Sequence, residues 1–82
     1  MKKNFYFYLF ECKDGSLYSG STQDLKKRVA QHNSGKGSKY VWAHGGGRLA
    51  YFEKFETWSK ALSREAKVKK LTRNEKLLLI KK

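Results

Sequence analysis

The stretch from residue 5 to residue 22 reads FYFYLFECKDGSLYSGST, and it decides the fold. Residues 5–12 are rich in aromatic side chains, which favour strands, and residues 17–22 form a second short run of the same kind. The Asp14-Gly15 pair between the two runs is a strong hairpin-turn signal. The sequence therefore predicts an antiparallel hairpin. Strand alternation predicts that its first strand puts Tyr6, Tyr8 and Phe10 on one face and Phe5, Phe7 and Leu9 on the other.

The residues that follow the hairpin predict a helix and then a long loop. We expect a helix from about Gln23 to Asn33, with Thr22 as its N-cap and Asp24 in its first turn. Residues 34–47 hold five of the seven glycines and predict a loop, with one helical turn across residues 39–42. A loop of this length in so small a protein is often functional.

The rest of the chain predicts one more strand and two helices. Residues 48–55 are expected to form the third strand, and Thr57 to cap a helix that runs to about Lys70. Thr72 and Glu75 form a capping box that opens the last helix. This order of elements predicts the α+β class, with helices packed on a three-stranded sheet. At 82 residues we expect one domain over residues 1–82.

The charge balance points to a polyanionic partner. The chain has 19 Lys and Arg against 7 Asp and Glu, a formal net charge of +12. Such an excess of positive charge destabilises the folded state by repulsion unless phosphate-rich molecules neutralise it. Ribosome-bound proteins, tRNA binders, DNA enzymes and binders of anionic membranes share this balance, and nucleic acid is the partner we favour.

The cysteine count and the short apolar runs bear on location. Cys12 is the single cysteine, so no intramolecular disulfide can form, which favours a reducing compartment. The longest apolar runs have six and four residues, far below the roughly 20 that span a bilayer. We expect a cytoplasmic protein that does not act at a membrane.

Three polar positions are candidates for chemistry on the predicted helices. Glu65 has apolar neighbours three and four positions before it and three after it, so its carboxylate should face the sheet. Burying a carboxylate is costly, and a basic side chain or a metal ion must balance it. Arg28 and His32 lie four apart and share a helix face. They fit either a solvated face or a phosphate-binding pair.

The tyrosines and the loop cations are the remaining candidates. Tyr6 and Tyr51 fit ordinary core positions. Tyr18 differs because Ser19-Gly20 follows it, and glycine permits a close approach of another group. His44 in the loop is expected to be exposed and unspecific. Cations mixed with an aromatic residue are typical of a nucleic-acid surface, to which we assign Lys27, Lys36, Lys39, Tyr40 and Arg48.

With these residues in place, the chain resembles the GIY-YIG nucleases, and among them the small stand-alone bacterial members. Residues 6–8 (YFY) and 18–20 (YSG) stand where the two tripeptides of that family lie. Arg28 and His32 follow, then residues 33–40 (NSGKGSKY), and then Glu65 within residues 61–65 (ALSRE). The chain departs from the family at Leu77, where many members carry an asparagine.

The resemblance implies a three-stranded antiparallel sheet flanked by helices and a metal-dependent hydrolysis of phosphodiesters. It implies that Tyr8 and Tyr18 position and activate the attacking water, that Arg28 stabilises charge on the phosphate, and that His32 assists them. It implies Glu65 as the protein ligand of one divalent ion, Mg²⁺ or Mn²⁺. Which tyrosine is the general base stays open.

The function hypotheses that follow belong to three classes. The first is an endonuclease that acts on DNA, in repair or processing, with a protein partner that supplies target specificity. The second is a non-catalytic module that binds nucleic acid and keeps the fold. The third is a basic adaptor for an acidic protein.

Overall fold

The hairpin at residues 5–22 is the centre of the fold. The computed structural model describes residues 4–81, so residues 1–3 and 82 of the expected domain lie outside the described part. Strand β1 (Phe5–Cys12) pairs antiparallel with β2 (Leu17–Thr22) on one side and with β3 (Gly47–Phe55) on the other. The sheet order is β2-β1-β3, which makes β1 central and β2 an edge strand. The predicted α+β class and three-stranded antiparallel sheet are confirmed.

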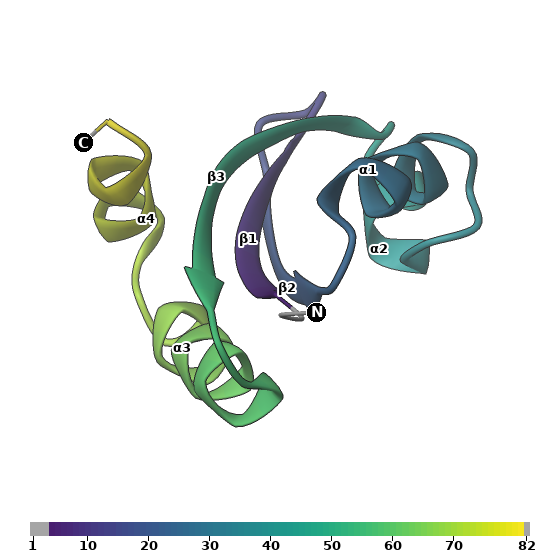
Figure 1. Cartoon of the computed structure of the whole chain (residues 1–82). Helices are drawn as coiled ribbons and strands as arrows, with labels where there is room; N and C mark the ends of the chain where they lie inside the picture. The colour runs from purple at the N-terminus through teal and green to yellow at the C-terminus, as the bar shows by residue number, and fades with distance from the viewer. Residues whose placement is uncertain (1–3, 82) are drawn as a thin grey trace.

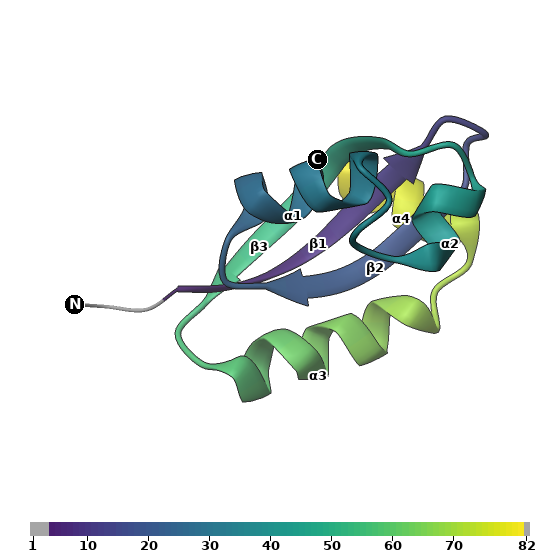
Figure 2. The same cartoon turned by 90° about the vertical axis from the view of Figure 1, so that its right-hand side faces the viewer.

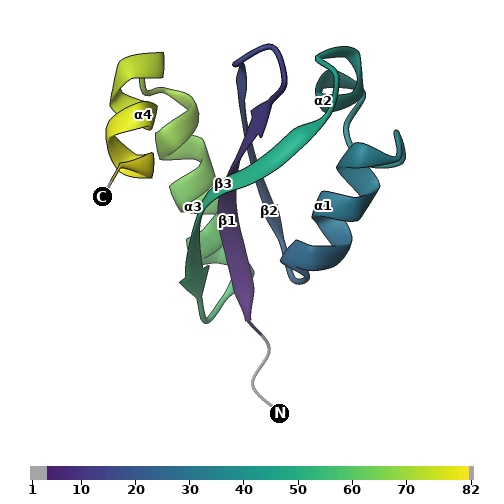
Figure 3. The same ribbon diagram turned by 90° about the horizontal axis from the view of Figure 1, so that it is seen from above.

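Helices cover both faces of this sheet, as Figures 1 and 3 show. Helices α1 (Leu25–Asn33) and α2 (Lys39–Ala43) lie on one face, and α3 (Trp58–Lys69) and α4 (Arg73–Ile80) on the other. Strand alternation divides the core as predicted. Tyr8, Phe10 and Cys12 pack with Val41 on the α1 face, and Phe7 and Leu9 pack with Val68 on the α3 face. Figure 2 shows α3 running alongside the edge strand β2.

The start of α1 differs from the prediction. Asp24, not Thr22, is the N-cap, and its carboxylate accepts a hydrogen bond from the Lys27 N–H (3.0 Å). Thr22 is held in the ladder opposite Tyr6 as the last residue of β2, and its hydroxyl accepts from the Asp24 N–H (3.1 Å). The assignment of Thr22 as the cap was wrong because pairing with β1 delays the helix to Leu25.

The other predicted boundaries agree with the structure within one or two residues. Ser38 caps α2 by accepting hydrogen bonds from the N–H groups of Tyr40 and Val41. Thr57 caps α3, and the capping box between Thr72 and Glu75 opens α4. No helix within residues 4–81 is long and apolar enough to cross a membrane.

The side chain of Asn33 ties the end of α1 to the start of β3. Its Nδ2 donates to the Gly47 carbonyl oxygen (3.0 Å), and its Oδ1 accepts from the Gly47 N–H (2.8 Å). A Cβ atom at Gly47 would overlap the backbone of Glu11 on β1, so glycine is required there. This pair of hydrogen bonds closes the loop of residues 34–46, which carries α2.

Replacing Asn33 by alanine should lower the free energy of unfolding by about 1 kcal/mol, because two exposed hydrogen bonds are lost. Urea unfolding followed by circular dichroism measures this difference. Lys26→Ala, at an exposed position of α1, is the matched control. Equal midpoints for the two variants would show that the loop does not depend on Asn33.

Candidate active site

Tyr8 and Gly20 fit against each other across the β1–β2 ladder. The two residues are register partners on the face that α1 covers. A Cβ atom at Gly20 would lie 2.5 Å from the Tyr8 hydroxyl oxygen and 2.6 Å from Cζ. The close approach predicted at Gly20 is therefore made by the tyrosine ring of the neighbouring strand. This fit holds the Tyr8 ring over β2, and the Tyr8 hydroxyl is directed towards α1.

The Tyr8 hydroxyl is hydrogen-bonded to Nε2 of His32 (2.8 Å), and both side chains are buried. On the other side of the imidazole, the Ser38 N–H donates to Nδ1 (3.3 Å). A backbone N–H can only donate, so Nδ1 is the unprotonated nitrogen and the neutral ring carries its proton on Nε2. His32 thus donates to the Tyr8 oxygen, which leaves the phenolic proton of Tyr8 free for another acceptor.

The loop reaches His32 through a second glycine. A Cβ atom at Gly37 would lie 2.6 Å from Nδ1 of His32, so a side chain there would separate the loop from the ring. The N–H groups of Ser34, Lys36 and Gly37 all donate to the Gln31 carbonyl oxygen, which folds the loop back over the end of α1. Gly37 therefore allows the loop to pack against His32.

Burial sets the protonation of these two groups. Burial raises the pKa of Tyr8 far above its ordinary value, and the nearby Tyr18 and Glu65 raise it further, while Arg28 opposes them. Burial lowers the pKa of His32, and the charge of Arg28 lowers it again. Both groups are therefore neutral at pH 7.

The Tyr18 ring lies between this buried pair and the exposed Tyr40. Its ring centroid lies 5.4 Å from that of His32 and 5.8 Å from that of Tyr40 on α2. Tyr40 is 44% exposed and stacks on His44, with centroids 4.2 Å apart. His44 was expected to be unspecific, yet it also pairs with Asp14 of the hairpin turn. The hydrogen bonds from Ser16 and His44 lower the pKa of Asp14.

Arg28 borders a hollow at the end of β2. The hollow has a volume of about 240 Å³, and Lys27 and Trp58 line it with Arg28. The Arg28 Nε atom is shielded from solvent and has no hydrogen-bond partner among residues 4–81. A guanidinium with an unused donor suits an anion such as a phosphate oxygen. Arg28 thus borders the hollow, whereas His32 of the same helix is fully buried.

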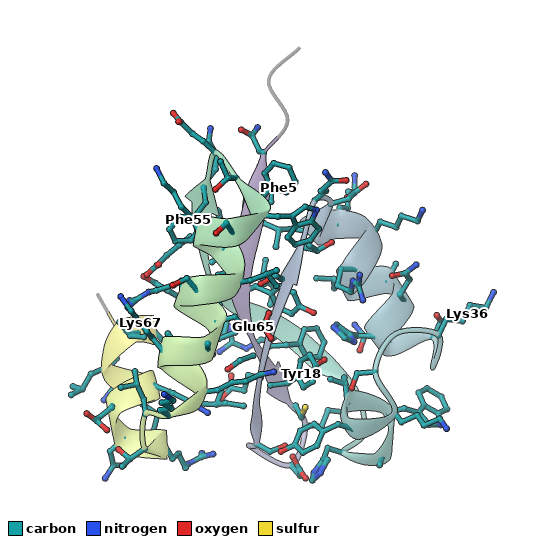
Figure 4. All side chains as sticks on the ribbon, turned by 90° about the horizontal axis from the view of Figure 1, so that it is seen from below. Phe5, Tyr18, Lys36, Phe55, Glu65 and Lys67 are labelled. Carbon is teal, nitrogen blue, oxygen red and sulfur yellow. The ribbon has the colours of Figure 1, made fainter. Side chains whose placement is uncertain are left out.

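Glu65 approaches from the opposite face of the sheet. The Ser21 hydroxyl of β2 donates to its Oε1 (2.7 Å), and Lys69 Nζ lies 2.8 Å from its Oε2. The Glu65 side chain is 17% exposed, and it faces the sheet as the sequence predicts. Figure 4 shows Glu65 and Tyr18 together in the middle of the molecule, while Lys36 projects at its margin.

The two halves of the site thus lie on either side of the edge strand β2. Tyr18 and Gly20 face α1, whereas Ser21, one position further along the strand, faces α3. Across the strand, Glu65 raises the pKa of Tyr8, and Tyr18 raises that of Lys69. The candidate residues Tyr8, Tyr18, Arg28, His32 and Glu65 therefore gather around one short piece of β2.

A metal ion at this site would depend on one carboxylate. Among residues 4–81, no group of three or more His, Cys, Asp and Glu side chains is placed to hold a metal together. Glu65 fits a single-carboxylate site because it is held by Ser21 through one oxygen, while its other oxygen is paired with the movable side chain of Lys69. Mg²⁺ is bound in this way when water and substrate oxygens complete its shell.

The residues assigned to nucleic-acid contacts are spread over several elements. Lys27 lies in the hollow beside Arg28, and Lys36 and Lys39 are exposed on the loop and at the start of α2. Arg48 on β3 forms an ion pair with Glu11 (2.6 Å), away from Lys27 and Arg28.

Sequence reasoning missed Ser21 and Ser38, because a serine next to a functional residue carries no distinctive pattern.

UPF0213 proteins of several organisms are similar to this chain. A UPF0213 protein of Clostridium perfringens is 53% identical over 75 residues, which are 92% of this chain and 81% of that protein. A UPF0213 protein of Staphylococcus saprophyticus is 47% identical over 92% of each chain. One from Haloquadratum walsbyi is 48% identical over 87% of this chain and 80% of its own.

Two solved structures have the same fold. The solution structure of a UPF0213 protein from Bacillus halodurans matches with a TM-score of 0.60 and 42% identity, over 95% of this chain and 83% of that one. A protein from E. faecalis matches with a TM-score of 0.64 and 44% identity, over 98% of this chain and 85% of that one.

The family model described as the GIY-YIG catalytic domain matches residues 4–77. With this match over nearly all of its length, the chain belongs to the GIY-YIG nuclease family.

Proposed function

We propose that this protein is a divalent-metal-dependent endonuclease that hydrolyses phosphodiester bonds in DNA. The observation that carries the proposal is the convergence of a neutral tyrosine–histidine pair, a guanidinium with an unused donor and an anchored carboxylate around β2. Hydrolysis of a phosphodiester needs a positioned water, a cation against the phosphate and a site for a metal ion. Each requirement has a candidate here: Tyr8 and Tyr18 for the water, Arg28 for the phosphate and Glu65 for the metal ion.

Tyr8 and Tyr18 would position the attacking water. Tyr8 is neutral, and it receives the Nε2–H of His32, so its own proton is available to a water or phosphate oxygen. For Tyr8 to accept a proton as a phenolate, positive charge must be added near it, and the Nε2–H of His32 would then stabilise the phenolate. His32 in this proposal is a positioning residue that donates to Tyr8.

Arg28 and Glu65 would hold the two charged partners of the reaction. Arg28, with Lys27 beside it, would receive the phosphate in the hollow at the end of β2. Glu65 would hold Mg²⁺ or Mn²⁺ through the oxygen that Lys69 now contacts, which frees the Lys69 ammonium for the nucleic acid. A divalent cation, when bound, polarises the phosphate and lowers the pKa of a coordinated water.

Family membership and the net charge of +12 support a nucleic-acid substrate, for which we propose DNA, and we propose the cytoplasm as the location. A buried free thiol at Cys12 suits a reducing compartment. We also propose that a protein partner supplies target specificity. The rival function is a non-catalytic module that binds nucleic acid through the same surface.

Glu65→Gln should lower the rate of cleavage of plasmid, branched and nicked DNA in Mg²⁺ or Mn²⁺ by about 100-fold or more, because the metal loses its protein ligand. DNA affinity in EDTA should be unchanged or higher, since a negative charge is removed. Gel assays measure the first quantity and fluorescence anisotropy the second.

Glu56→Gln is the matched control, since it removes the same charge at an exposed position before α3. Cleavage that is equal in the two variants would sink the proposal. Binding without any metal-dependent cleavage would favour the rival module.

The ring of His32 should show the Nε2–H tautomer in nitrogen-15 correlation spectra. It should keep this state as the pH falls through 6.5, because burial and Arg28 lower its pKa. Ser38→Pro removes the N–H that Nδ1 accepts, and we expect tautomer exchange, a shift of the Tyr8 ring signals and slower cleavage.

Ser38→Ala is the control for this experiment. Both variants lose the hydroxyl that caps α2, but only the proline variant loses the N–H. If both variants keep the Nε2–H tautomer, the Ser38 amide does not set the state of His32.

A further inference from the structure

We propose that the groove beside Trp42 binds an unpaired nucleobase by stacking, independent of its identity. The proposal rests on the nucleic-acid partner proposed above and adds a substrate class: strands with unpaired nucleotides. Six residues line the groove, which has a volume of about 510 Å³: Lys13, Asn33, Trp42, Gly45, Gly46 and Gly47.

Trp42 offers one open ring face. Its side chain is 58% exposed, although its neighbour Val41 is fully buried and anchors α2 in the core. A Cβ atom at Gly35 would lie 3.2–3.4 Å from Cδ2, Cε3 and Cε2 of the indole. Similar distances to three adjacent ring atoms mean that Gly35 lies under the face of the ring. One face is therefore supported by the backbone, and the other is open to solvent.

The three glycines provide a flat wall without free donors. The N–H groups of Gly45 and Gly46 donate to the carbonyl oxygens of Trp42 (3.1 Å) and Val41 (2.9 Å). The Gly47 N–H donates to Asn33, and the Asn33 amide returns a hydrogen bond to Gly47. These polar groups are satisfied within the chain, so the wall has little capacity to distinguish base edges. Recognition in this groove must come from stacking and charge.

Charge favours a nucleotide over an aromatic side chain of a protein partner. Lys13 lies in the groove, Lys36 and Lys39 precede Trp42 by six and three residues, and the protein carries a net charge of +12. Bases stacked on exposed aromatic rings, with cations for the phosphates, are the general mode of binding to single strands. A base inside a duplex has both faces covered by its neighbours, so an open indole selects an unpaired one.

The groove is linked to the candidate active site through α2. Tyr40 of this helix stacks on Tyr18, whereas Trp42, two positions later, lies on a different face of the helix against Gly35. Asn33, which closes the groove, directly follows His32. A nucleotide held on Trp42 would therefore flank the strand position at Tyr8 and Tyr18, which favours cleavage near nicks, flaps and single-stranded tails.

The test uses Trp42 as its own reporter. The chain has two tryptophans, and Trp58 lines the hollow of Arg28, so Trp58 is kept and the emission of Trp42 is taken as the difference between the parent protein and Trp42→Leu. Both proteins are titrated in EDTA with end-labelled oligothymidylate and with an abasic strand of equal length. We expect oligothymidylate to quench Trp42 emission and the abasic strand to leave it nearly unchanged. Trp42→Leu should weaken the binding of oligothymidylate about 5- to 100-fold, judged by anisotropy of the label, and hardly affect the abasic strand.

Two controls separate stacking from other effects. Trp42→Phe keeps an aromatic ring and should retain most of the affinity. Phe52→Leu removes another exposed ring, 51% exposed on β3, and should change nothing. Equal quenching by the abasic strand, or full affinity in Trp42→Leu, overturns the groove assignment alone. If oligothymidylate does not bind the parent protein, the nucleic-acid partner itself is wrong, and the inference falls with it.

Discussion

The buried hydrogen bond between Tyr8 and His32 is the contact on which the rest of the site depends. It joins the central strand to α1, and it exists only because two glycines leave room on either side. Gly20 on β2 admits the tyrosine ring, and Gly37 in the loop lets the Ser38 N–H reach the imidazole. A substitution at either glycine would alter the geometry of both side chains. Strand, helix and loop are thus coupled through one imidazole.

The neutral and the ionic side chains of the site lie in different places around this bond. The tyrosine–histidine pair lies in the α1 face of the sheet, where burial disfavours charge on either group. The ionic residues Arg28, Glu65 and Lys69 lie nearer to solvent around the edge strand β2. This arrangement places a polar, uncharged pair between a cationic and an anionic group. A phosphodiester would supply the opposite charge for Arg28, and a divalent ion would take the place of Lys69 at Glu65.

Local patterns predicted the hairpin and the two faces of β1, because a turn signal and strand alternation act over a few residues. They also placed Arg28 and His32 on one helix face and turned Glu65 towards the sheet. They could not choose between Thr22 and Asp24 as a cap, since both residue types cap helices and the β1–β2 ladder decides. The bonds from Ser21 to Glu65 and from His44 to Asp14 join segments 44 and 30 positions apart. No periodicity encodes such contacts.

The position of β2 at the sheet edge has a consequence for self-association. A free strand edge is a template for pairing with another copy of the chain, and proteins protect such edges with charge. Here α3 brings Glu65 and Lys69 alongside the edge, next to Ser21. Charge at this position disfavours the pairing of β2 with another copy of the chain. Selection for solubility and selection for chemistry would then favour the same side chains, and a relative that lost the reaction could still retain them.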